Sequence, residues 1–164
     1  MKSRTSILIK TCLVAACACL LCSCSSGDSS SAEIIELEQK LMQSDDSFYA
    51  LTHFLNENVD QGIVFVSMDG KIQEANQKYL DILGYTMEEA KSLTYQQITP
   101  EKWSEMEDLL RENQVMNRGY CRIYEKEYVR KDGTVCPIRT QAWLITDENG
   151  EPWRLMGIVR EIDS

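Results

Sequence analysis

The fold is decided by the stretch from Gly119 to Ile162, which reads GYCRIYEKEYVRKDGTVCPIRTQAWLITDENGEPWRLMGIVREI. Two turn signals, Asp132-Gly133 and Asn149-Gly150, divide this stretch into three runs in which apolar and polar residues alternate. Asp-Gly and Asn-Gly place a glycine where a hairpin turn needs a positive φ angle. The pattern therefore predicts three antiparallel strands. Their mostly apolar face needs a cover, which the preceding chain must supply.

Alternation assigns one face of the second and third strands to the interior of the domain. The residues on that face are Cys136, Ile138, Thr140, Ala142, Leu144, Leu155, Gly157 and Val159. For the first strand, we take Asp132-Gly133 as a two-residue turn, which pairs Glu125 with Thr140. The same register pairs Glu127 with Ile138. Both carboxylates are then expected towards the interior, either as acids of a pocket or as side chains solvated at the edge of the sheet.

Two of the seven cysteines, Cys121 and Cys136, lie in this part of the chain. In the same hairpin register they are about 26 Å apart at ~3.3 Å per residue, whereas a disulfide needs Cα atoms within about 7 Å. We therefore expect no disulfide between them. Residues 25–164 contain no Cys-x-x-Cys motif, so zinc and covalently bound haem lack their usual ligands.

The residues before Gly119 predict two strands followed by three helices. The expected strands are Gly62–Ser67 and Lys71–Ala75, and the expected helices are Gln77–Leu83, 86–93 and 99–117. Asn76 is the expected N-cap of the first helix, and Gly84 ends it. Thr86 and Glu89 form a capping box for the second helix, and Thr99 before a proline is expected to cap the third.

The apolar side of the third predicted helix consists of Trp103, Met106, Leu109 and Leu110. This order of elements predicts an α+β domain, in which a five-stranded antiparallel sheet is covered by helices on one face.

Residues 52–163 resemble the PAS sensor domain of the S-box type, and we place the domain at residues 58–164. The resemblance rests on four motifs in order: Asn76–Glu89 (NQKYLDILGYTMEE), Arg130–Thr134 (RKDGT), Thr146–Gly150 (TDENG) and Gly157–Ile162 (GIVREI). It implies a pocket between the sheet and the helices, which binds a small molecule, a cofactor or a protein in signal transduction. The pocket candidates are Ile138, Thr140, Ala142, Leu155, Gly157, Val159 and Glu125. The alternative is a plain core, because many pockets of this family are filled by their own side chains.

The resemblance does not require a cofactor. Haem-binding PAS domains generally use a histidine on the long helix, and the helix expected from Glu101 to Asn117 contains none. His53 is the single histidine, and we expect it to face water. The Asn-Cys-Arg run of the light-oxygen-voltage flavin class does not occur between Tyr95 and Trp103. Noncovalent flavin or haem remains an alternative. We expect no metal site, no catalytic residues and no enzymatic activity.

The first 23 residues have the composition of a secretory signal. A basic start is followed by the apolar run Thr11–Leu21, which is too short to span a bilayer. Leu21 and Ser23 resemble the lipobox of bacterial lipoproteins, which makes Cys24 the expected lipidated residue. The alternatives are an ordinary signal, an uncleaved anchor, or Cys19 as the modified residue.

Residues 24–33 are rich in serine and predict a flexible tether. Residues 34–57 predict an amphipathic helix with the apolar stripe Ile34, Leu37, Leu41, Phe48, Leu51 and Leu55. Such a stripe needs a partner, either a second copy of the chain in a homodimer or the domain's own sheet.

Charge and the predicted anchor together indicate partners and location. The chain has a net charge of −9, and residues 24–164 keep 14 basic and 26 acidic residues, a net charge of −12. Such a surface repels phosphate backbones, so nucleic acid is not expected as a partner. We expect a sensor or adaptor in the bacterial cell envelope, lipid-anchored on the extracytoplasmic side. Because the chain stops at Ser164, two residues after the last motif, no effector domain is expected in the chain.

Overall fold

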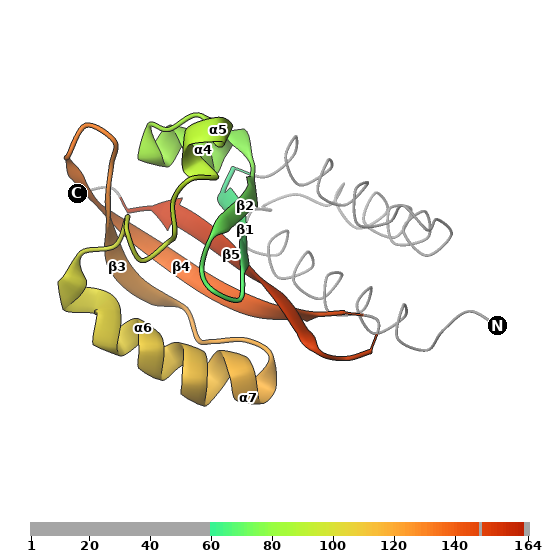
Figure 1. Cartoon of the computed structure of the whole chain (residues 1–164). Helices are drawn as coiled ribbons and strands as arrows, with labels where there is room; N and C mark the ends of the chain where they lie inside the picture. Colours follow the sequence, from blue (N-terminus) through green and yellow to red (C-terminus); the bar gives the residue numbers. More distant parts are fainter. Residues whose placement is uncertain (1–59, 148, 163–164) are drawn as a thin grey trace, which may run out of the picture. The chain divides into compact units, whose positions relative to one another are not determined.

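The computed structural model describes residues 60–147 and 149–162 (Figure 1). The predicted signal peptide, the lipidated Cys24, the tether and the apolar stripe from Ile34 to Leu55 lie outside the described residues. The described elements are the strands β1 (Gly62–Ser67), β2 (Ile72–Ala75), β3 (Tyr124–Val129), β4 (Val135–Thr146) and β5 (Pro152–Glu161), and the helices α4 (Gln77–Leu83), α5 (Met87–Ala90), η1 (Glu101–Trp103), α6 (Ser104–Leu110), η2 (Arg111–Val115) and α7 (Met116–Arg118). Within the described part, no helix has the length and apolar character that crossing a membrane requires.

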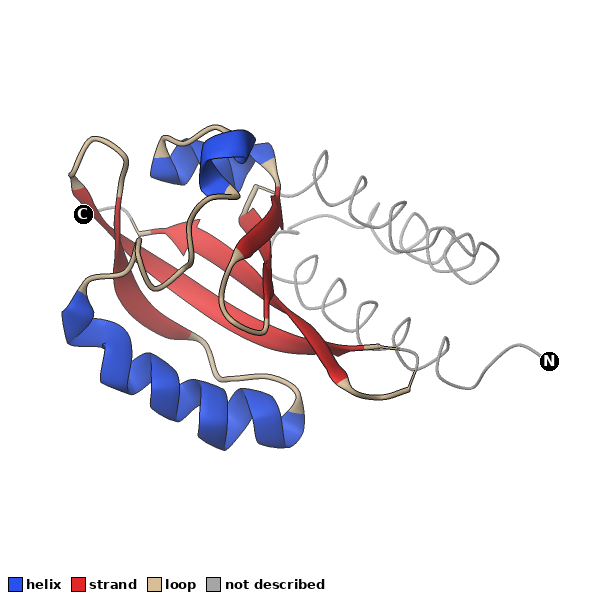
Figure 2. Ribbon diagram, viewed as in Figure 1, coloured by secondary structure: helices blue, strands red, loops and turns tan. Residues whose placement is uncertain are grey.

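The five strands form one antiparallel sheet in the order β2-β1-β5-β4-β3. The helices pack against this sheet, which makes an α+β domain (Figure 2). This confirms the five-stranded antiparallel sheet expected from the sequence. One cluster of buried apolar side chains joins the sheet to the helices. It includes Val64, Val66, Ile138, Leu155 and Val159 from the strands and Tyr79, Leu80, Leu83, Ala90 and Leu110 from the helices.

Asn76 begins α4 as predicted and also fastens this helix to β1. Its Oδ1 accepts hydrogen bonds from the backbone N–H of Tyr79 (3.0 Å) and of Ile63 (2.8 Å). Its Nδ2 donates to the carbonyl oxygen of Gln61 at 2.8 Å. Both the oxygen and the nitrogen of the buried amide are therefore hydrogen-bonded, as buried polar groups generally are. Gly84 ends the helix at φ +76°, in the left-handed region that favours glycine.

The capping box at the start of α5 is also present. Thr86 Oγ1 accepts from the Glu89 N–H at 3.3 Å, and the Glu89 carboxylate accepts from the Thr86 N–H at 3.0 Å. The helix is shorter than expected, since it ends at Ala90 and not near Leu93.

The long helix between α5 and β3 is not uniform. It begins as a 3-10 turn, η1, continues as α6, passes through the π-helical stretch η2 and ends with α7 before Gly119 at φ +87°. Thr99 does not cap it, because Pro100 occupies the N-cap position, and the Thr99 hydroxyl instead donates to the Tyr95 carbonyl oxygen at 2.8 Å. The expected apolar side is wrong at Leu109, which is 53% exposed. Leu110 is buried.

The β3–β4 hairpin has a three-residue loop and not the two-residue turn expected from Asp132-Gly133. Arg130 N–H donates to the carbonyl oxygen of Thr134 (2.8 Å), and Gly133 N–H donates to that of Arg130 (2.9 Å). Gly133 has φ +84°, the left-handed conformation that such loops require at their last residue. Arg130 and Thr134 are therefore the closing pair of the hairpin.

This loop shifts the register of β3 by one residue from the prediction. Tyr124 lies opposite Thr140, and Glu125 lies opposite Arg139. Because side chains alternate along a strand, a shift of one residue turns all of them to the other face. The expectation that Glu125 and Glu127 point to the interior is wrong.

Candidate functional site

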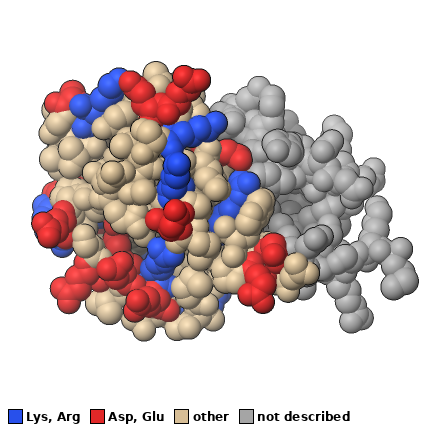
Figure 3. Space-filling view, viewed as in Figure 1, with Lys and Arg blue, Asp and Glu red and all other residues tan. Residues whose placement is uncertain are grey.

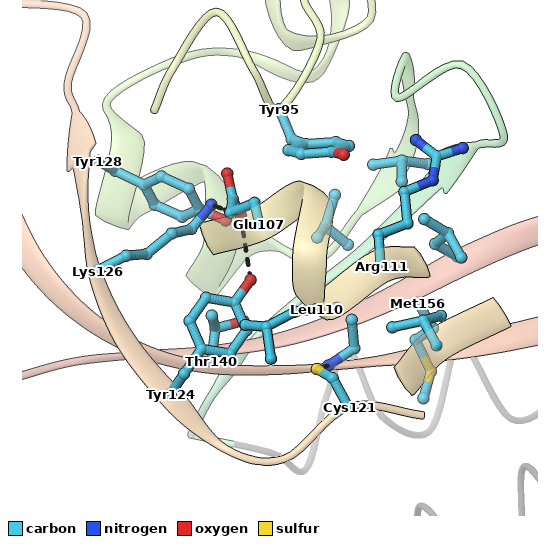
Figure 4. Close-up of a pocket in the computed structure, with 16 residues that line it drawn as sticks. Tyr95, Glu107, Leu110, Arg111, Cys121, Tyr124, Lys126, Tyr128, Thr140 and Met156 are labelled. Carbon is cyan, nitrogen blue, oxygen red and sulfur yellow. Dashed lines mark hydrogen bonds and ion pairs between the residues drawn. The ribbon is translucent and has the colours of Figure 1, made fainter. Parts of the chain in front are cut away.

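A cavity of about 70 Å³ lies between the inner face of the sheet and the wall formed by α6 and η2 (Figure 4). Its lining comprises Val64, Val66, Tyr95, Glu107, Leu110, Arg111, Val115, Cys121, Tyr124, Lys126, Tyr128, Thr140, Ala142, Leu155, Met156 and Gly157. Most of these residues come from β1, β3, β4, β5 and the long helix, while Tyr95 and Cys121 come from the loops on either side of that helix, so the cavity is assembled from distant parts of the chain. Aliphatic and aromatic side chains together make up most of the lining, and the charged groups are confined to three residues.

Lys126 of β3 and Glu107 of α6 form a buried ion pair at one end of the cavity. The distance from Nζ to Oε1 is 2.5 Å, and the two side chains are 2% and 8% exposed. Lys126 Nζ also donates to Thr99 Oγ1 at 2.9 Å and lies 4.6 Å from the centre of the Tyr128 ring. The ammonium group is therefore surrounded by a carboxylate, a hydroxyl and an aromatic ring, all of which stabilise a positive charge.

Tyr124 completes the environment of Glu107. Its phenolic O–H donates to Glu107 Oε1 at 3.0 Å, so this oxygen accepts two hydrogen bonds, and Oε2 takes part in neither (Figure 4). Burial lowers the pKa of Lys126, and the Glu107 carboxylate opposes this shift. Burial and the Glu107 charge both raise the pKa of Tyr124. The phenol therefore stays protonated and continues to donate to the carboxylate at neutral pH.

Arg111 lies on the helical wall one residue after the end of α6. Its Nη2 donates to the carbonyl oxygen of Met68, which holds the half-buried side chain across the cavity from the sheet. Tyr95 lies above the cavity with its hydroxyl directed towards Arg111 (Figure 4). Burial raises the pKa of Tyr95, and the guanidinium opposes this shift. The phenol and the guanidinium thus form a second polar group, separate from the Lys126–Glu107 pair.

The floor of the cavity is apolar and leaves little spare room. It consists of Val64, Val66, Ala142, Leu155 and Gly157. A Cβ atom added at Gly157 would lie 3.1 Å from Val64 Cγ1, so a side chain at this position would press on β1. Cys121 lines the cavity as a free thiol, and its Sγ accepts from the Ala142 N–H at 3.2 Å.

Residues 60–164 match the family of the PAS domain. This chain is a member of the PAS domain family. Solved PAS structures agree in fold. A PAS domain from Colwellia psychrerythraea is similar at 23% identity and a TM-score of 0.63, covering 70% of this chain and 97% of that one. A PAS domain of a two-component sensor histidine kinase is similar at 14% identity and a TM-score of 0.59, covering 73% and 100%.

A third similar structure, from Burkholderia thailandensis, is described as the PAS domain of a LuxR-family transcriptional regulator in complex with ethanol. It is 10% identical with a TM-score of 0.56, and the match covers 68% of this chain and 97% of that one. No curated protein sequence matches this chain. At these identities the structural likeness shows the fold, which is the sensory fold typical of signal-transduction proteins.

Four of the seven predicted pocket residues line the cavity of this PAS domain: Thr140, Ala142, Leu155 and Gly157. Ile138 and Val159 point to the same side of the sheet, but they are buried in the core and are not part of the lining. Glu125 is on the opposite face, where its Oε1 pairs with Arg139 Nη2 at 2.7 Å. Glu125 is therefore not a pocket residue, because the true register turns it outwards.

The charged residues of the cavity were not among those predicted. Lys126 and Tyr124 were missed because the register of β3 was shifted by one residue. Their alternation with Tyr128 was visible in the sequence, and it would have indicated an inward face of two tyrosines around a lysine. Glu107 and Arg111 are four residues apart on one helix, and no sequence motif distinguishes them from the neighbouring acids and bases.

The cavity also bears on the cofactors considered from the sequence. Pockets for drug-sized ligands have volumes of roughly 300–1,000 Å³, and flavin and haem are at least that large. A cavity of about 70 Å³ would enclose only part of either cofactor. The described residues include no group of three or more side chains suited to holding a metal ion.

Proposed function

We propose that this PAS domain is the sensing module of a lipid-anchored signalling protein of the bacterial cell envelope, and that its cavity binds a small ligand. The observation that carries the proposal is the cavity itself, which combines an apolar floor with two separate polar groups. The fold, typical of sensory proteins, supports a role in signal transduction.

The solved PAS structure described in complex with ethanol supports a ligand of a few atoms. We propose binding and no chemical reaction for the cavity. Nucleic acid is left out as a partner. The net charge of −9 and the interspersed acidic and basic residues on the face drawn in Figure 3 support this choice.

Native mass spectrometry of residues 25–164, combined with a visible absorption spectrum, tests the sensing proposal. We expect a colourless protein that retains or takes up a small molecule. A visible absorption band would instead favour the alternative of a noncovalent flavin or haem. A protein that binds no added small molecule under any condition would contradict the proposal.

The lipid anchor and the extracytoplasmic location are separate parts of the proposal. They rest on the lipobox resemblance before Cys24. We expect Cys24→Ala to abolish labelling with a fatty-acid analogue and to release the protein from the membrane fraction, while Cys19→Ala leaves both unchanged. Unchanged labelling of the Cys24→Ala variant would contradict the anchor.

Dimerisation through the stripe from Ile34 to Leu55 is proposed as the route by which the module contacts a partner. It rests on the heptad spacing of the apolar residues. Analytical ultracentrifugation should show a dimer that Leu41→Asp dissociates. A wild-type chain that stays monomeric at high concentration would remove this part of the proposal.

A further inference from the structure

Arg111 is the one charged residue of the lining that has no acidic partner among residues 60–147 and 149–162. Lys126 and Glu107 neutralise each other at 2.5 Å. The ion pairs of the described residues do not include Arg111, whose Nη2 donates to the neutral carbonyl oxygen of Met68. The ionised residues of the lining therefore sum to one positive charge over an apolar floor.

Glu107 does not supply the missing negative charge. Its Oε1 is held by Lys126 and by the Tyr124 hydroxyl, which fixes the carboxylate towards β3. A cation that is partly removed from water without an anionic partner is energetically unfavourable, and a bound anion would relieve this. A guanidinium presents its N–H groups in a planar fork that suits a carboxylate, and the Tyr95 hydroxyl is directed to the same place (Figure 4).

We infer that the cavity takes a small monocarboxylate, with its carboxylate on Arg111 and Tyr95 and its short alkyl part on the floor of Val64, Val66 and Leu155. This inference rests on the proposed ligand-binding function and specifies the class of ligand. A cavity of about 70 Å³ limits the ligand to a chain of a few carbons, such as propionate. A dicarboxylate would bring its second charge close to the Glu107 carboxylate and is disfavoured. A neutral alcohol or amide leaves the guanidinium charge uncompensated.

The first experiment compares ligands on the unmodified full chain in detergent micelles, using saturation-transfer NMR and calorimetry. The series consists of propionate, propionamide, 1-propanol and succinate, which differ in charge at similar width. We expect propionate to bind at least about tenfold more tightly than each of the others, the usual effect of one charge-assisted hydrogen bond. Equal binding of propionamide or propanol would overturn the monocarboxylate class and leave the ligand-binding function standing. Tighter binding of succinate would also overturn it.

A second experiment assigns the binding to Arg111. Arg111→Met keeps an unbranched side chain as long as the stem of arginine and removes the guanidinium, and we expect it to weaken propionate binding by about tenfold to a hundredfold. Binding of propanol should be unchanged, which shows that the cavity is intact. Arg139→Met, on the outer face of the sheet, is the matched control and should bind propionate like the unmodified chain. Full propionate binding by Arg111→Met would overturn the inference, and so would the absence of propionate binding to the unmodified chain.

Discussion

Two neighbouring residues of β3 make ion pairs on opposite faces of the sheet, and the contrast between these pairs is instructive. Glu125 binds Arg139 on the outer face at 2.7 Å, with side chains that are 57% and 56% exposed. Lys126 binds Glu107 on the inner face at 2.5 Å, with side chains almost fully buried. The two distances between the charged atoms are similar, so the surroundings of each pair decide how much it contributes to stability. Water screens the charges of the outer pair, so each contributes little to stability. The charges of the inner pair are removed from water, so each depends on the other for compensation.

The largest expected difference between the two faces follows from breaking the inner pair. Lys126→Met leaves the Glu107 charge buried without a cation, and we expect the free energy of unfolding to fall by about 3–5 kcal/mol. Urea denaturation followed by circular dichroism measures this. The double variant Lys126→Met with Glu107→Leu should recover most of the loss, because it removes both charges. A single variant within about 1 kcal/mol of the unmodified chain would show that the pair is not desolvated.

Tyr124→Phe tests the same side of the sheet with a smaller change. Loss of the O–H that donates to Glu107 should lower the free energy of unfolding by about 1.5–3 kcal/mol at pH 7. The variant should also change the response to alkali. The pKa of Tyr124 is raised in the folded protein from its ordinary value of 10.0, so the folded state keeps a proton that the unfolded chain loses.

The sign of this alkaline effect follows from proton linkage. The contribution of Tyr124 is fully present below pH 10 and is lost as the pH rises above it, with a slope of about 1.4 kcal/mol per pH unit. Tyr79 and Tyr128 have pKa values raised by burial and act in the same direction. The free energy of unfolding should therefore fall less steeply with pH for Tyr124→Phe than for the unmodified chain. Denaturation curves recorded at several pH values between 10 and 11.5 measure this. An unchanged slope would mean that the phenol already titrates normally in the folded state.

The smallest effect is expected on the outer face. Glu125→Gln removes the charge that faces Arg139, and we expect the free energy of unfolding to change by less than about 1 kcal/mol. The difference should disappear at about 1 M salt, where exposed charges are screened over ~3 Å. Denaturation at low and high salt measures both. If Glu125→Gln lowered the free energy of unfolding as much as Lys126→Met, the two ion pairs would not differ in the way we expect.

The sequence predicted correctly those features whose partners are close along the chain. The Thr86 capping box joins residues three apart, and Asn76 reaches the N–H of Tyr79 in the first turn of its helix. The β3–β4 register failed because Asp-Gly occurs both in two-residue turns and in three-residue loops ending in a left-handed glycine. The charged site could not be inferred in the same way, because Lys126 and Glu107 are 19 residues apart on different elements. Only the packed fold brings them together.

The π-helical stretch η2 determines how this part of the chain can vary in length. Arg111 is the first residue of this stretch and Val115 the last, and both line the cavity. Each residue of a helix turns the following side chains by about 100°. An insertion of one residue in α6 would rotate Val115 out of the wall and change the point at which the chain enters β3. A deletion of one residue within η2 can instead be absorbed by a return from π-helical to α-helical hydrogen bonding, so the wall is expected to tolerate a lost residue better than an added one.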